Sequence, residues 1–80
     1  MKLVDGGELW KLHATHGIPI EIGLIVAQQR GFIPTWDRIV TEAEKDGTNI
    51  PRFKRRLLSA CRDVYPPDVC SRLERFLWPG

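Results

Sequence analysis

The sequence has few cysteines, no long apolar run and little net charge. Its only cysteines, Cys61 and Cys70, are too few for the disulfide framework that holds many small secreted domains together. The longest apolar stretch, residues 22–27, is far shorter than the roughly 20 residues that a membrane-spanning helix needs. The first residues lack the apolar core of a signal peptide. We therefore expect a cytoplasmic protein with reduced thiols and no membrane association.

Motifs for catalysis and for cofactor binding are also missing. The sequence has no glycine-rich phosphate loop, no nucleophile elbow and no paired carboxylates with a nearby base. The two serines, Ser59 and Ser71, lie among charged positions without a histidine nearby in sequence. We therefore expect a protein that is not an enzyme and that carries no cofactor.

What is present is the composition of an ordinary globular protein. The 80 residues are 42% hydrophobic and 28% charged, and they fit a single domain spanning residues 1–80. Glycines and prolines divide the chain into helical segments at residues 6–15, 19–30, 36–46, 51–65 and 68–77. The pattern predicts an all-α fold, a compact bundle of four to five short helices.

Local signals place the ends of these helices. Asp5 is the expected N-cap of the first helix and Thr35 that of the third, because a short polar side chain can bond the free N–H groups of a first turn. Glycines at 17, 31 and 47 suit the left-handed residue that ends many helices. The Pro66-Pro67 pair separates the last two helices, because proline cannot continue a helix that precedes it.

The second segment is apolar on nearly every side, which predicts a central helix that the third, fourth and fifth helices surround. It is also rich in β-branched residues and contains Gly23, so a short strand is the alternative. The fourth segment has a clear apolar stripe, in which we expect Phe53 and Leu57 to be core residues.

The opposite face of the fourth segment is basic. Guanidinium groups suit phosphates and carboxylates because they offer several donors in a fixed fork. The face predicts contact with an acidic partner, protein or nucleic acid, and the alternative is a solvated surface paired with acids of neighbouring helices. Its members are Arg52, Lys54, Arg55, Arg56 and Arg62.

A helix-turn-helix is a second candidate. Ala27 precedes the turn residue Gly31 by four positions, and a helix capped by Thr35 follows, which is the spacing of that DNA-binding unit. The helix that would enter the DNA groove nevertheless carries several acidic residues, which phosphates repel. The alternative is a plain packing corner between two helices.

Metal binding has weaker support. His13 and His16 are three residues apart on one helix, but Cys61 and Cys70 are separated by nine residues and by the two prolines. Structural zinc sites use closer cysteine pairs. We therefore interpret the cysteines as core thiols and the histidines as partly buried, and we expect no metal.

Two tryptophans lie off the apolar stripes of their helices. Trp10 and Trp78 are expected at the surface, as is Leu58, and exposed aromatic residues often anchor protein interfaces. Self-association is one consequence that we consider.

The leading hypothesis is a small protein-binding accessory factor, an adaptor, inhibitor or assembly helper of the kind that phages and mobile elements often encode. It would hold an acidic protein surface with the arginine-rich face, Trp10 and Trp78. The alternative is a helix-turn-helix-like DNA-binding regulator.

Overall fold

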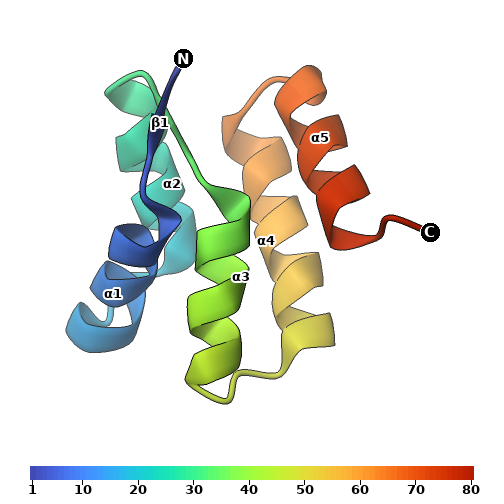
Figure 1. The fold of residues 1–80 in the computed structure, drawn as a ribbon. Helices are drawn as coiled ribbons and strands as arrows, with labels where there is room; N and C mark the ends of the chain where they lie inside the picture. Colours follow the sequence, from blue (N-terminus) through green and yellow to red (C-terminus); the bar gives the residue numbers. More distant parts are fainter.

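The computed structural model describes residues 1–80 and contains five helices, which confirms the predicted helical bundle (Figure 1). The observed helix ends lie within two residues of the predicted ones. The elements in chain order are β1 (Lys2–Val4), α1 (Gly6–His16), α2 (Ile20–Gln29), β2 (Phe32–Pro34), α3 (Trp36–Lys45), α4 (Ile50–Val64) and α5 (Pro67–Leu77). None of the helices combines the length and the apolar character that crossing a membrane requires.

The helix ends follow the local signals, with one exception. The Asp5 side chain accepts a hydrogen bond from the Gly7 N–H at 2.9 Å, and Gly17 ends α1 in the left-handed conformation at φ 70°. Thr35 occupies the N-cap position of α3, but its side chain does not cap that helix. Its Oγ1 instead accepts a hydrogen bond from the Gly6 N–H at 2.9 Å, so it joins the start of α3 to the start of α1.

A two-stranded parallel sheet is a feature that the sequence pattern did not predict. Strand β1 pairs with β2 in the register Lys2↔Phe32, Leu3↔Ile33 and Val4↔Pro34. Strands of three residues are too short to show the apolar and polar alternation that marks a strand in sequence. The α1–α2 hairpin forms the crossover between them, as a parallel pair requires.

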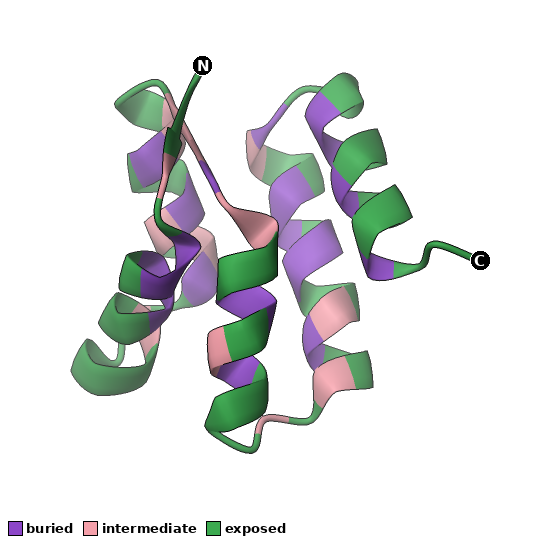
Figure 2. Cartoon of the chain, in the orientation of Figure 1, coloured by how far each residue is buried: buried purple, intermediate pink, exposed green.

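The centre of the fold is α4 rather than α2, so this prediction was wrong. Helix α4 packs against α2, α3 and α5, and Leu57 and Cys61 on it are fully buried. The predicted core residues Phe53 and Leu57 are both buried. Figures 1 and 2 show α3 and α4 side by side, with α5 beyond α4 and with buried positions concentrated on one side of each helix.

Helix α2 is buried on one side only. Ile20, Leu24 and Ala27 face the core, whereas Ile22 and Val26 are 47% and 41% exposed. The prediction that the other helices surround α2 fails because α5 packs mainly on α4 and α3 packs mainly on α1. The exposed side of α2 is therefore apolar, and it forms part of the site described next.

Candidate binding surfaces

The basic face of α4 is exposed but partly neutralised. Nε and Nη2 of Arg56 each donate a 3.0 Å hydrogen bond to the carboxylate of Glu21 on α2. This hydrogen bonding lowers the pKa of Glu21 and raises that of Arg56. The Arg62 guanidinium lies 3.5 Å from the Glu74 carboxylate of α5.

Three other basic side chains complete the arginine-rich face. The Lys54 ammonium group donates a 3.0 Å hydrogen bond to the Leu77 carbonyl and so satisfies a free acceptor at the end of α5. Arg52 and Arg55 are exposed and take part in no ion pair. The cations available to a partner on this face are therefore those two, and the remaining members mainly tie α4 to α2 and α5.

The prediction that Trp10 is a surface anchor was wrong. Its side chain is 5% exposed, and its Nε1 donates a 2.6 Å hydrogen bond to Oδ2 of Asp46. Its ring meets Phe53 edge to face, with centroids 5.3 Å apart. Leu58 is also buried, whereas Trp78 is 42% exposed at the end of α5. Trp78 therefore remains available for contact and Trp10 does not.

The thiols and imidazoles occupy separate environments. The sulfur atoms of Cys61 and Cys70 lie 3.4 Å apart in the core between α4 and α5. Burial raises the pKa of the Cys61 thiol to about 12, and its hydrogen bond with Cys70 adds to this shift. Nδ1 of His13 donates to the Ile18 carbonyl at 2.9 Å, while His16 is exposed. No three histidine, cysteine, aspartate or glutamate side chains gather as a set of metal ligands.

The two helices of the candidate helix-turn-helix do not pack as that unit requires. Strand β2 lies between α2 and α3 in the chain. Helix α2 packs mainly on α4 and on α1, whereas α3 packs mainly on α1. Gly31 does adopt a positive φ of 78°, but the turn that it makes leads into the strand. The Ala27–Gly31 spacing therefore marks the end of α2 without forming the DNA-binding corner.

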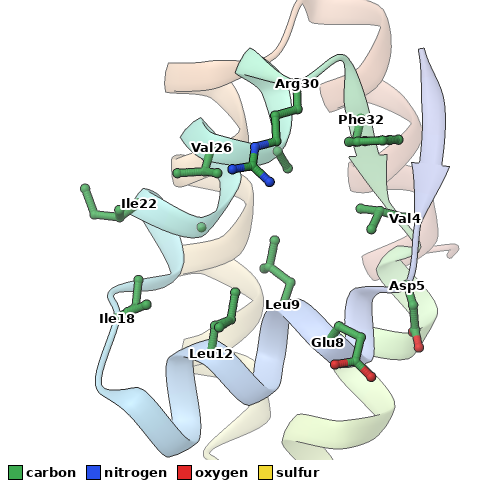
Figure 3. Close-up of a pocket in the computed structure, with 12 residues that line it drawn as sticks. Val4, Asp5, Glu8, Leu9, Leu12, Ile18, Ile22, Val26, Arg30 and Phe32 are labelled. Carbon is green, nitrogen blue, oxygen red and sulfur yellow. The ribbon is translucent and has the colours of Figure 1, made fainter.

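An apolar groove that the sequence did not reveal lies between α1, α2 and the sheet (Figure 3). Its volume is about 330 Å³. Leu9 and Leu12 form one wall on α1, Ile22 and Val26 form the other on α2, and Phe32 lies at the sheet end. The sequence signal was the excess of apolar residues on α2, which we interpreted as burial inside the bundle.

Glycine allows the two walls to approach each other closely. A Cβ atom at Gly23 would lie 3.3 Å from Cγ of Leu9, which is tighter than an ordinary contact. The absence of a side chain at this position on α2 therefore lets Leu9 pack against the helix backbone. This contact between Leu9 and α2 closes the bottom of the groove. The outer parts of its two walls, which form the rim, are Leu12, Ile22 and Val26, and these residues are 45%, 47% and 41% exposed.

The charges around the groove are not balanced. Arg30, at the end of α2, extends its guanidinium over the groove and takes part in no ion pair (Figure 3). On the α1 side, the carboxylate of Asp5 lies 3.6 Å from the Arg38 guanidinium and that of Glu8 lies 3.7 Å from the Lys11 ammonium. Of the three charged residues that line the groove, Arg30 is therefore the one without an ion-pair partner.

Fold and groove together define a small helical protein with a parallel two-stranded sheet and one apolar surface groove. Comparison of the chain with protein-family models, with curated proteins and with solved structures gives no match.

Proposed function

We propose that this chain is a small non-enzymatic accessory factor, an adaptor, inhibitor or assembly helper, that binds a protein partner through the apolar groove. The observation that carries the proposal is the exposure of Leu12, Ile22 and Val26 along one continuous groove. Contiguous apolar surface of this kind marks interaction sites, because leaving it in water is unfavourable.

Burial elsewhere in the molecule supports this choice of surface. Eighteen apolar residues form one buried cluster, which includes Ala27 on the groove side of α2 but neither Ile22 nor Val26. Ile22 and Val26 lie outside this cluster and still keep 47% and 41% of their surface in water, which a partner could cover. Covering the part of each side chain that is still exposed contributes about 1 kcal/mol, because full burial of such a side chain is worth roughly 1.5–3 kcal/mol.

The arginine-rich face adds a second contact in this proposal. Arg52 and Arg55 are exposed and unpaired, so an acidic patch on the partner would find two free guanidinium groups there. Charges at the rim of an interface mainly raise the association rate and favour the correct partner. We therefore expect the groove to supply most of the affinity and the arginines to supply selectivity.

The test is an affinity capture from lysate of the source cells, after nuclease treatment and with washes at low and high salt. The wild-type chain is compared with an Ile22→Ser, Val26→Ser double variant. We expect the wild type to retain a discrete protein that the double variant loses, because the groove then lacks the apolar rim on α2.

Ile25 provides a matched control. It is 38% exposed on the same helix but does not line the groove. An Ile25→Ser variant removes a comparable exposed side chain and should keep the partner. Equal capture by the wild type, the double variant and the control would show that the groove is not the binding surface.

A further inference from the structure

We propose that the groove receives a helical segment of a partner protein whose aliphatic face carries a carboxylate opposite Arg30. This inference rests on the proposed function and specifies the structure and charge of the partner. It follows from the shape of the groove, from the groups that line it and from the single unpaired charge at its mouth.

Groove depth favours a macromolecule over a small ligand. A pocket for a small molecule normally encloses most of the ligand surface. Here the rim residues Leu12, Ile22 and Val26 each keep more than two fifths of their surface in water. A small apolar molecule in such a groove would itself stay largely hydrated, whereas a protein segment covers the groove and its rim together.

The lining favours a helix over an extended strand. The groove presents side chains, and its polar groups belong to charged residues at the edge. An extended segment would bring backbone N–H and C=O groups against apolar walls without partners, which is unfavourable. A helix satisfies these groups internally and offers an aliphatic ridge to the groove between α1 and α2.

The charge at the mouth identifies the polar group of the partner. The guanidinium of Arg30 lies beside the apolar walls and has no acidic neighbour within ion-pair distance. A carboxylate on the docked helix would pair with it, because guanidinium and carboxylate match in charge and geometry. The acidic residues Asp5 and Glu8 on the opposite side already have basic neighbours.

The experiment uses the full chain, labelled with ¹⁵N, and two synthetic helical peptides of about four turns. Both peptides carry leucines at positions i, i+3, i+4 and i+7. One has glutamates flanking the ridge at both ends, and the other has lysines there. Titration followed by backbone amide shifts measures both the site and the affinity.

We expect both peptides to shift the amides of Leu12, Ile22 and Val26, with the glutamate peptide binding about two- to fivefold more tightly, as an exposed ion pair provides. Arg30→Glu should reverse this order. Arg75→Glu is the matched control, since it makes the same change in net charge at an exposed position of α5, outside the groove lining, and it should leave the order unchanged.

Other results would overturn the inference. These are the absence of groove shifts with the glutamate peptide, equal affinity of the two peptides, or reversal by Arg75→Glu as well. A dimer in sedimentation that Ile22→Ser, Val26→Ser dissociates would assign the groove to a second copy instead. If capture from lysate still depends on the groove while the peptides fail, the proposed function stands and only the helical, acidic partner is rejected.

Discussion

Tyr65, at the end of α4, donates a 2.7 Å hydrogen bond from its Oη to the backbone carbonyl of Phe32 in strand β2. Its ring also meets Trp36, at the start of α3, edge to face with centroids 6.1 Å apart. One side chain therefore fixes the C-terminal end of the central helix to the small sheet that borders the apolar groove.

Tyr65→Phe should lower the free energy of unfolding by about 1 kcal/mol. The ring packing is kept, but the Phe32 carbonyl loses its hydrogen-bond partner in a partly buried position. Urea denaturation of the variant beside the wild type measures the difference. A change near zero would mean that a water molecule donates to the Phe32 carbonyl in place of the Tyr65 hydroxyl, with no loss of stability.

The free energy of unfolding should fall at alkaline pH, because two buried groups, Tyr65 and Cys61, must ionise when the pH is high enough. Burial raises the pKa of Tyr65 and that of Cys61 to about 12, from ordinary values of 10.0 and 9.0. Both groups are held neutral in the folded state, so their contribution is complete below pH 9 and is lost as the pH rises through about 12.

Thermal melts between pH 8 and 12 measure this loss. Tyr65→Phe removes one of the two groups, so above pH 10 its stability should fall less steeply with pH than that of the wild type. Identical slopes for the two proteins would show that Tyr65 ionises equally easily in the folded and unfolded states.

The thiols of Cys61 and Cys70 should react with iodoacetamide only when the chain opens. Both thiols are buried. Only the thiolate form of a cysteine is nucleophilic, and the raised pKa of Cys61 keeps that thiol protonated. We expect the alkylation rate of the native protein to rise in parallel with the unfolded fraction in urea. Rapid labelling without denaturant, at the rate of a free thiol, would contradict the burial of this pair.

Gly6→Ala should destabilise the protein by about 1–3 kcal/mol through overpacking. A Cβ atom at this position would meet the Thr35 backbone carbonyl, and it would lie 2.6 Å from Cγ1 of Ile39. The start of α1 would have to move away from α3. Chemical denaturation measures the effect.

Gly7→Ala is the control for that variant. A Cβ atom there would lie 3.2 Å from Nη2 of Arg38 and from Oδ1 of Asp5, and a shift of a few tenths of an ångström relieves both contacts without moving a backbone carbonyl. We expect a much smaller loss of stability than for Gly6→Ala. Equal losses would indicate a general intolerance of the first turn of α1 rather than the close approach to α3.

Leu57→Ala should cost about 2–5 kcal/mol, because it leaves a cavity in the core. Leu57 is fully buried on α4, the helix that contacts α2, α3 and α5. Denaturant unfolding measures the loss. A value well under 1 kcal/mol would mean that the core closes around the vacancy.

The helices were predictable because the signals that begin and end them are local. Asp5, Gly17 and Asn49 act within one turn of their own position, through a cap or a left-handed residue. The apolar stripe of α4 is equally local, since it depends on residues three and four positions apart, and it correctly identified Phe53 and Leu57 as core.

The tertiary structure decided which apolar surfaces are covered. The stripes show that a helix has an apolar side, but they do not show which helix lies against it. Trp10 lies off its stripe and is nevertheless buried, because its ring packs against Phe53 of α4 and Asp46, 36 residues away, accepts its N–H. Ile22 and Val26 are strongly apolar and nevertheless exposed, because α4 occupies the centre that α2 was expected to fill.

The number of helices, their approximate ends and the buried side of α4 all depend on neighbours along the chain, so they could be predicted from the sequence. The three-residue strands, the burial of Trp10 and the groove beneath Arg30 became visible in the folded chain alone. Each of them depends on contacts between segments far apart in sequence, and these contacts cannot be inferred from patterns of neighbouring residues.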